Sequence, residues 1–371
     1  MLRSADRSVE LASPLHHLGL DDGWLAAFSD AEVLRLDSAP PSLARVTRTD
    51  RGACDLIGAD GPVRATWGAD VVAAVGNDPQ AVPSTGDWVS LQLWPDGHQT
   101  VEAVLPRRTA VVRASARGTS SGQVLAANVD VVAVVEGLYP DPDLGRVERL
   151  LALAWQSGAQ PRLVLTKADL GAAGLDVAEQ VTGQVAAGCP VDVTAAHEGG
   201  GLDDLRSLLS SGASIALLGA SGVGKSTLLN ALVGGAEVMR TQSLGAVHKG
   251  RHTTVTRELH LVPGGGCVID TPGLRSVGLV GEDGLEEVFS DVDELAADCR
   301  FTDCSHGVEP GCAVQEAVEA GLLAQRRLDS WVKLRREAAW QASRVDARLR
   351  QEQVRVFKQR TKAHRQRPNR P

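Results

Sequence analysis

Residues 215–232 read IALLGASGVGKSTLLNAL, and this stretch decides the fold. Four apolar residues typical of a buried strand lead into a glycine-rich loop, and helix-favouring residues follow the loop. In such a loop backbone N–H groups surround phosphates, the lysine binds the β- and γ-phosphates, and the next hydroxyl binds Mg²⁺. The helix N-terminus adds its partial positive charge. We therefore predict a nucleotide site made of Gly219, Ala220, Ser221, Gly222, Val223, Gly224, Lys225, Ser226 and Thr227, with Ser226 as a Mg²⁺ ligand.

A motif that recognises the base lies upstream of this loop. Residues 166–169, Thr-Lys-Ala-Asp, follow a predicted strand and are similar to the guanine-recognition motif of GTPases. The carboxylate of such a motif accepts hydrogen bonds from two neighbouring N–H groups of guanine, which adenine does not offer. The alternative for residues 166–169 is a helix-capping turn, in which such short matches also occur. Residues 194–195, Thr-Ala, resemble a second element that contacts guanine through backbone N–H groups. The predicted guanine-binding residues are Thr166, Lys167, Ala168, Asp169, Thr194 and Ala195.

Two further elements follow the glycine-rich loop. Residues 270–273, Asp-Thr-Pro-Gly, follow the predicted strand 267–269, so that Asp270 is placed to reach Mg²⁺ and the N–H of Gly273 to reach the γ-phosphate. The polar loop 249–254 is suited to a switch segment. We predict that Thr254 binds Mg²⁺, with Thr253 as the alternative.

The order of these elements predicts the architecture. The guanine motif precedes the phosphate loop, whereas a Ras-like GTPase has the reverse order, so the chain reads as a circular permutation. Strands and helices alternate between residues 129 and 218, which predicts a mostly parallel sheet with helices on both faces. Residues 44–112 show short apolar runs, including 71–75, that are separated by turn residues, which predicts a small antiparallel barrel or sandwich.

A cysteine cluster follows the nucleotide motifs. Cys299, Cys304, His306 and Cys312 lie within fourteen residues and supply three thiolates and one imidazole. This set completes the tetrahedral coordination of one structural Zn²⁺, whereas the alternative is a chance cluster of packing cysteines. Polar neighbours such as Asp298 and Asp303 favour an exposed metal-binding loop.

Together the permuted order, the loop 250–254 and the cysteine cluster resemble the ribosome-small-subunit-dependent GTPase A family. The resemblance implies an N-terminal OB-fold, a circularly permuted GTPase domain and a C-terminal zinc-binding domain. The expected boundaries are an N-terminal extension over 1–36, an OB-fold-like domain over 37–112, a linker over 113–126, the GTPase domain over 127–282, and a zinc-binding domain with a basic helical tail over 283–371.

The expected catalytic group departs from that of Ras-like enzymes. They orient the attacking water with a glutamine after the Asp-x-x-Gly motif, but here that position holds Leu274, which cannot bond to water. His252 in the switch loop is the available substitute, and the resemblance implies that it is catalytic. The alternative is that His252 only caps or solvates a mobile loop.

Charge and composition limit the partners. No apolar run is long enough for a membrane helix and no secretory signal is evident, so we expect a cytoplasmic protein without a membrane partner, and nothing requires an oligomer. The chain carries a net charge of −8, yet residues 321–371 hold 15 Lys and Arg against 4 Asp and Glu. This basic tail fits either rRNA or a solvated helix, and the resemblance favours rRNA.

The predicted function is GTP hydrolysis in late maturation of the small (30S) ribosomal subunit. The protein would bind the subunit in its GTP state and leave after subunit-stimulated hydrolysis. One alternative is a constitutive RNA-binding scaffold in which GTP is structural. Another is a P-loop ATPase or small-molecule kinase, which Lys167 and Asp169 argue against.

Overall fold

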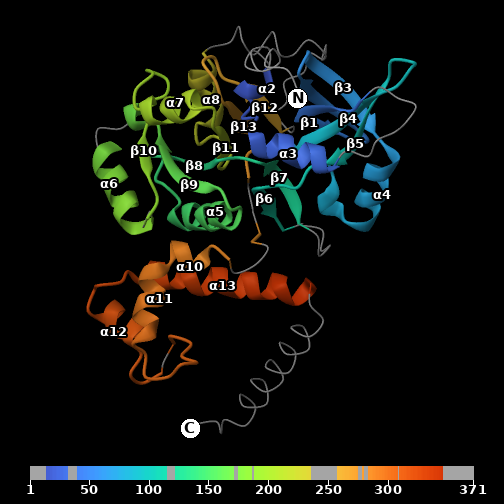
Figure 1. Ribbon diagram of the computed structural model, residues 1–371. Coiled ribbons are helices and arrows are strands. Elements are labelled where there is room, and N and C mark those ends of the chain that lie inside the picture. Colours follow the sequence, from blue (N-terminus) through green and yellow to red (C-terminus); the bar gives the residue numbers. More distant parts are fainter. Residues whose placement is uncertain are drawn as a thin grey trace.

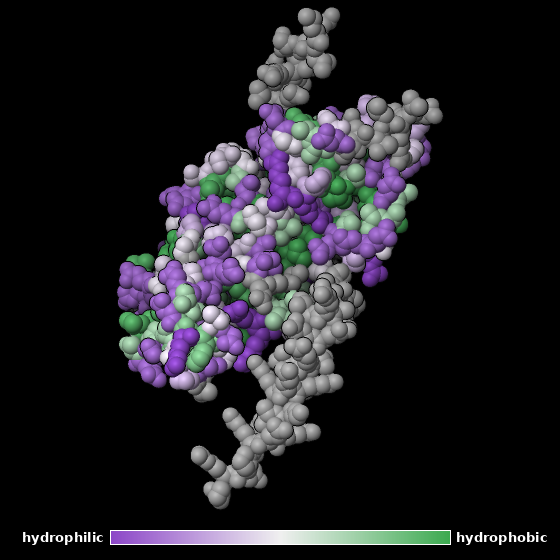
Figure 2. Space-filling view, turned by 60° about the horizontal axis from the view of Figure 1, so that its bottom comes forward, coloured by the Kyte–Doolittle hydropathy of each residue, from purple (hydrophilic) through white to green (hydrophobic). Residues whose placement is uncertain are grey.

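The computed structural model describes residues 14–31, 40–114, 122–170, 174–185, 188–234, 257–274, 278–279, 283–307 and 309–345. These residues form a barrel, a six-stranded sheet with helices on both faces, and a layer of C-terminal helices beneath the sheet (Figure 1). On the face shown in Figure 2 hydrophilic residues prevail, and hydrophobic ones form separate small groups. Within the described ranges, no helix combines the length and apolar character needed to cross a membrane.

Five strands close the barrel. They are β1 (Ser42–Asp50), β2 (Ala53–Gly58), β3 (Gly61–Trp67), β4 (Trp88–Leu93) and β5 (Gln99–Val104), and they join in the order β1-β2-β3-β5-β4. Apolar side chains from every strand meet inside, among them Val46, Leu56 and Val101. The predicted OB-like barrel is therefore confirmed.

The prediction of a strand over the apolar run 71–75 is wrong. It lies in helix α4 (Ala69–Asn77), which is followed by the 3₁₀ helix η1 (Pro79–Ala81). A short continuous apolar run fits either structure, and here the helical spacing places Val71 and Val75 against the barrel core while Val72 is 55% exposed. The helix covers one end of the barrel (Figure 1).

The sheet has the order β10-β9-β8-β11-β13-β12. Its strands are β8 (Val131–Gly137), β9 (Gln160–Thr166), β10 (Val191–Val193), β11 (Ser214–Leu218), β12 (Glu258–Leu261) and β13 (Cys267–Asp270). Only the edge strand β12 runs antiparallel to its neighbour. Helices α5 (Leu144–Gln156) and α6 (Gly174–Val185) pack on one face, and α7 (Asp203–Ser210) and α8 (Lys225–Val233) on the other, as predicted for a permuted GTPase domain (Figure 1).

A hairpin occupies part of the predicted linker. Strands β6 (Ala110–Arg113) and β7 (Gln123–Ala127) pair antiparallel, so Arg113 and residues 123–126 of the predicted linker lie in this hairpin. The reason is that Val124 and Leu125 are buried in the core that α5 shares with the sheet, although small polar residues precede them in the sequence. The predicted domain boundaries stay predictions.

The described part of the N-terminal extension is helical. Helices α2 (Pro14–His17) and α3 (Asp22–Ala31) lie against the barrel, and the Trp24 ring contacts the Trp88 ring with centroids 5.8 Å apart. Leu25, which follows Trp24 in α3, is 37% exposed, so this part of the helix faces solvent.

Arg45 joins three parts of the molecule. This buried barrel residue donates hydrogen bonds from Nη1 to the carbonyl oxygen of Leu18 and to Oγ of Ser214 (2.8 Å). Its Nη2 donates to the carbonyl oxygen of Asn128 at 2.7 Å. Since these acceptors lie in the N-terminal segment, in β11 and after β7, one guanidinium positions the barrel against the base of the sheet.

The C-terminal helices attach to α5. They are α10 (Leu285–Val288), α11 (Ser290–Ala297), α12 (Ala313–Glu319) and α13 (Gln325–Val345). Glu148 of α5 is fully buried and pairs with Arg327 of α13 at 2.9 Å, and Arg327 also pairs with Asp291 of α11 at 2.8 Å. Removing one member of a buried pair costs about 3–5 kcal/mol, so this pair fixes the C-terminal helices to the sheet.

Candidate nucleotide site and metal cluster

Three of the predicted motifs meet in one pocket. The parallel strands β9, β11 and β13 end at the same edge of the sheet, and the motif that follows each of them lines a cavity of about 570 Å³. The lining residues are Thr166, Lys167, Asp169, Leu170, Ala196, His197, Ser221, Gly222, Gly224, Lys225, Ser226, Thr227, Asp270, Thr271, Pro272 and Gly273. Gly219, Ala220 and Val223 belong to the same loop but are not part of the pocket wall.

The phosphate loop needs glycine at Gly224. This residue has φ +106°, and a Cβ atom there would lie 2.8 Å from Oγ1 of Thr166. Thr166 is buried, and its hydroxyl donates to the carbonyl oxygen of Val223 within the loop. The first residue of the guanine motif therefore holds the phosphate loop in place, which explains why a hydroxyl serves at this position.

Lys225 begins helix α8 and lies almost fully inside the site, 7% exposed. Its Nζ donates to the carbonyl oxygens of Gly219 and Ala220, at 2.9 Å each. Burial lowers the pKa of Lys225, and the negative charge of Asp270 partly offsets this effect. Among the described residues its Nζ bonds only to these neutral carbonyl groups, so Lys225 is a ready partner for the charge of a phosphate.

Asp270 fits the role of a Mg²⁺ partner. The residue is 8% exposed, and its Oδ1 is enclosed without a hydrogen-bond partner among the described residues. Burial raises the pKa of Asp270, while the charges of Lys225 and His260 oppose this rise. An enclosed carboxylate oxygen beside the hydroxyl-bearing wall at Ser226 is the kind of donor set that Mg²⁺ takes.

Lys167 and Asp169 also line the pocket. Lys167 has φ +63°, and its Nζ donates to the carbonyl oxygen of Tyr139 at 2.9 Å, which holds its side chain beside the pocket wall. Asp169, in the 3₁₀ helix η2 (Ala168–Leu170), is exposed to the pocket. The N–H of Ala168 donates to the carbonyl oxygen of Thr194 at 3.2 Å. This hydrogen bond fixes the turn that carries Asp169.

The structure places the Thr194–Ala195 element behind the wall. Both N–H groups already donate to backbone carbonyl oxygens, that of Thr194 to Leu165 (2.7 Å) and that of Ala195 to Gly200 (3.1 Å). The wall is formed instead by Ala196 and His197, which the sequence reasoning missed because a two-residue motif fixes the turn but not which N–H groups are free. The N–H groups of Ala196 and His197 have no backbone acceptor among the described residues.

Gly273 and Leu274 connect the pocket to the C-terminal helices. A Cβ atom on Gly273 would lie 2.8 Å from the backbone nitrogen of Ser221, so the two loops approach as closely as glycine allows. Leu274 points away from the pocket: it is 5% exposed and belongs to the core that includes Leu334 of α13. The position of the usual catalytic glutamine is therefore a packing position here.

Two predicted site residues are not placed by the structure. His252 and Thr254, with the alternative Thr253, lie outside the described residues. The same holds for the basic tail beyond residue 345. Their predicted roles stay predictions.

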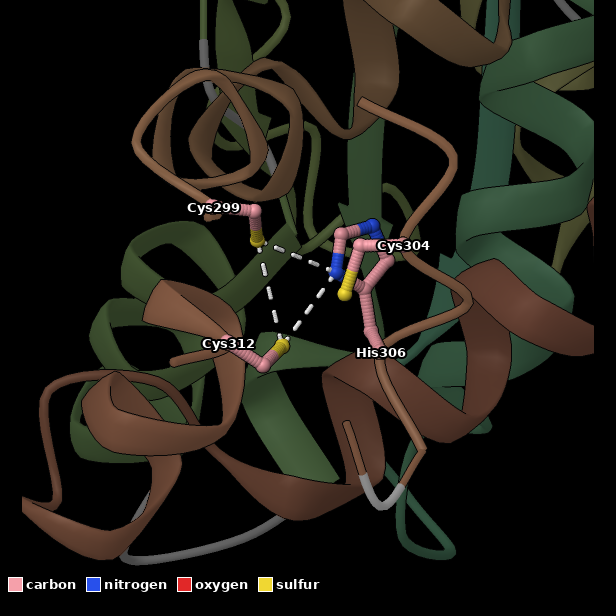
Figure 3. A group of neighbouring side chains, drawn as sticks. All are labelled: Cys299, Cys304, His306 and Cys312. Carbon is pink, nitrogen blue, oxygen red and sulfur yellow. Dashed lines mark hydrogen bonds between the residues drawn. The ribbon is translucent and has the colours of Figure 1, made fainter. Parts of the chain in front are cut away.

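The cysteine cluster comes together as predicted. The candidate ligand atoms of Cys299, Cys304, His306 and Cys312 all lie within 4.8 Å of one another (Figure 3). Nδ1 of His306 is 3.5 Å from Sγ of both Cys299 and Cys312, and those two sulfur atoms are 3.9 Å apart. Zn–S bonds of about 2.3 Å in a tetrahedron imply S–S separations of about 3.8 Å, so the donor set fits one metal ion.

The surroundings of the cluster hold the donors toward a common centre. The His306 ring meets the edge of the Trp331 ring of α13 at 5.2 Å between centroids, and the His306 carbonyl oxygen accepts from Gln315 Nε2. Burial, together with the nearby thiols of Cys304 and Cys299, raises the pKa of Cys312 to about 11. Crowded thiols of this kind deprotonate readily only when a cation neutralises them.

Comparison with known proteins agrees with the geometry. The sequence model of the RsgA GTPase family matches residues 104–280. The chain is 49% identical to the small ribosomal subunit biogenesis GTPase RsgA of Streptomyces avermitilis, over 93% of this chain and 91% of that protein. It is 42% identical to the protein of the same name from Opitutus terrae, over 90% and 92% of the two chains.

Solved structures give the same result. The crystal structure of YjeQ from Thermotoga maritima matches with a TM-score of 0.55 and 26% identity, covering 80% of this chain and 98% of that one. YloQ, described as a circularly permuted GTPase, shares the fold with a TM-score of 0.55 and 23% identity, covering 82% of this chain and 98% of that one. The permuted site, the barrel, the cysteine cluster and these relatives lead to one conclusion: the chain belongs to the RsgA family of GTPases.

Proposed function

We propose that the protein hydrolyses GTP during late maturation of the small (30S) ribosomal subunit, binds the subunit and its rRNA in the GTP state, and leaves after subunit-stimulated hydrolysis. The observation that carries this proposal is the single pocket that Asp169, Lys225 and Asp270 line together. This pocket offers a carboxylate for guanine, together with a lysine and an enclosed carboxylate for phosphates and their metal ion. The names of the relatives supply the subunit.

Binding and catalysis are divided among these groups. Asp169 selects guanine. Lys225 leaves its carbonyl partners and binds the β- and γ-phosphates, and the N–H of Gly273 donates a hydrogen bond to the γ-phosphate. Ser226, Asp270 and Thr254 (or Thr253) hold Mg²⁺, which offsets phosphate charge when bound. Because Leu274 is buried away from the pocket, it leaves the attacking water unoriented, and we assign that role to His252. Basal turnover is therefore slow until the subunit positions the switch loop.

The cysteine cluster and the C-terminal helices form the part of the protein that responds to loss of the γ-phosphate. We assign one structural Zn²⁺ to Cys299, Cys304, His306 and Cys312, and rRNA contact to the basic tail over 346–371. Gly273 is followed directly by Leu274, which belongs to the same core as Leu334 of α13. A backbone shift at Gly273 on loss of the γ-phosphate is therefore transmitted to α13 through Leu274. The protein acts in the cytoplasm as a monomer.

One experiment tests the proposal. GTP turnover is measured with and without purified 30S subunits, and strong stimulation is expected. Absence of stimulation together with tight, nucleotide-independent subunit binding would favour a constitutive scaffold with structural GTP. Competition between GTP and ATP for the pocket separates the GTPase from a P-loop ATPase or kinase, because only guanine satisfies Asp169.

A further inference from the structure

The backbone of Asp270 is held on both sides by neighbouring strands. At the end of β13 it is in register with Leu217 of β11 and with Glu258 of β12. Thr271, the next residue, donates from Oγ1 to the carbonyl oxygen of Leu217 at 2.7 Å. The carboxylate, by contrast, has an enclosed Oδ1 without a hydrogen-bond partner within the part of the chain that the structure describes. A carboxylate that holds a metal ion in one geometry needs a partner that fixes its direction.

His260 lies beside Asp270 on the same face of the sheet. In the antiparallel pair of β12 and β13, Glu258 is opposite Asp270 and His260 is opposite Val268 (Figure 1). Alternate residues of a strand point to one face, so His260 and Asp270 are diagonal neighbours, a relation that typically places Cβ atoms about 7 Å apart. Val268 belongs to the core under α8, the helix that Lys225 begins, so this is the face toward the phosphate loop.

The two side chains have complementary atoms that are not yet bonded. His260 is 7% exposed and Asp270 is 8% exposed. Among the described residues, Nδ1 of His260 has no hydrogen-bond partner and is enclosed, as is Oδ1 of Asp270. A ring nitrogen can donate a proton, whereas a carboxylate oxygen can only accept one. Because an unmet buried polar atom costs free energy, a bond between the two, made directly or through one enclosed water, is favoured.

The neighbouring groups on this face leave the role to His260. Glu258 is opposite Asp270 but carries the same charge, and like charges in that position repel each other. Lys225 donates to two carbonyl oxygens of the phosphate loop. Burial lowers the pKa of His260 and so favours the neutral ring, although the charges of Glu258 and Asp270 oppose this fall. A neutral ring can donate to the carboxylate without cancelling the negative charge that a metal ion needs.

We propose that His260 is a positioning residue for Asp270: its Nδ1–H donates to the carboxylate and thereby fixes the direction in which Asp270 faces Mg²⁺. The inference rests on the proposed function, which assigns Mg²⁺ to Asp270. Strand β12 begins at Glu258, shortly after Thr254, the switch-loop residue assigned to the same ion. The strand that leaves the switch loop therefore also orients the ligand on the neighbouring strand, so both sides of the ion depend on β12.

The test uses two substitutions that place an amide donor differently. The amide nitrogen of asparagine lies near the position of Nδ1 of a histidine, and that of glutamine near Nε2. The full-length protein, His260→Asn and His260→Gln are loaded with a fluorescent non-hydrolysable GTP analogue, and its dissociation rate is measured over a range of buffered free Mg²⁺ concentrations. Since a lost hydrogen bond to a metal ligand weakens metal binding by about 10- to 100-fold, His260→Gln should need about tenfold more Mg²⁺ to slow dissociation by half. His260→Asn should stay within about threefold of the unaltered protein.

A role in packing alone predicts the opposite order. Asparagine leaves a larger cavity than glutamine in place of an imidazole, so His260→Asn would then be the more damaged variant. That order overturns the proposal, and so does an equal Mg²⁺ requirement in His260→Gln and the unaltered protein. Equal affinity of all three proteins for GDP in excess chelator shows that the variants are folded. Weaker GDP binding by both variants in chelator overturns the proposal too, because His260 then supports the fold and not the ion.

Asp270→Asn separates this inference from the proposed function. It should raise the Mg²⁺ requirement more than His260→Gln does, since it removes the charge that the ion binds. In the double variant, His260→Gln should add nothing further, because its effect passes through Asp270, and additive effects would contradict this role. If Asp270→Asn requires no more Mg²⁺ than the unaltered protein, the assignment of Mg²⁺ to Asp270 fails, and the inference fails with it. A raised requirement in Asp270→Asn but not in His260→Gln refutes only the role of His260.

Discussion

The contact between Thr166 and Val223 makes the guanine motif a support for the phosphate loop, and it can be tested directly. The Thr166 hydroxyl is buried and donates to the Val223 carbonyl oxygen, between Gly222 and Gly224. Thr166→Val keeps the shape of the side chain but removes the donor. A buried carbonyl left without its partner costs about 1–3 kcal/mol, which corresponds to about 5-fold to 150-fold in an equilibrium constant. We expect affinity for a fluorescent GDP to fall by about tenfold within this range.

The control for this prediction is Thr166→Ser, which keeps the hydroxyl and removes only a methyl group. Its GDP affinity should stay within about threefold of the unaltered protein, since a lost methyl costs less than a lost donor. Affinity is measured by titration at fixed Mg²⁺, and the dissociation rate by displacement with unlabelled GDP. If the serine variant is weakened as much as the valine variant, packing of Thr166 against Gly224 is responsible and the hydrogen-bond argument is refuted.

Three further predictions concern catalysis, metal and pH. His252→Ala should leave GTP affinity nearly unchanged and abolish subunit-stimulated turnover; stimulated turnover at the normal rate would exclude a catalytic role. Removal of zinc with a chelator should alter the fluorescence of Trp331, whose ring contacts His306, while GDP still binds, and a parallel loss of GDP binding would mean that the cluster supports the whole fold. Burial lowers the pKa of His260 below its usual 6.5. Below pH 6.5 the unfolded chain therefore binds a proton that the folded chain does not, so the melting temperature should fall on acidification, and by less in His260→Gln. An identical pH dependence of the two melting temperatures would exclude His260.

Elements with a local physical requirement could be predicted from the sequence. The phosphate loop needs glycine where φ is positive, as at Gly224, and its lysine follows at a fixed spacing. The cysteine cluster is confirmed as a set of converging donors because its four ligands lie close along the chain. The parallel strands were predictable because strands buried on both faces are continuously apolar.

Other features depend on contacts that no local pattern records. The run 71–75 is a helix because the barrel end offers Val71 and Val75 a surface, and β7 is a strand because α5 covers it. The pocket wall at His197 depends on which amides the turn leaves free. The buried Arg45 is satisfied by acceptors from three distant segments, so its burial could not be inferred from its neighbours in the sequence.

The pair formed by Glu148 and Arg327 has a consequence for synthesis. Its members are 179 residues apart, and α5 is translated long before α13. At about 5–20 residues per second, the ribosome needs about 10–35 s to deliver the arginine after the glutamate. During that interval the nascent sheet carries an acidic group destined for a buried position, together with the apolar side of α5 that α13 will cover. The half-made protein is therefore exposed to aggregation and to chaperones until its last long helix emerges.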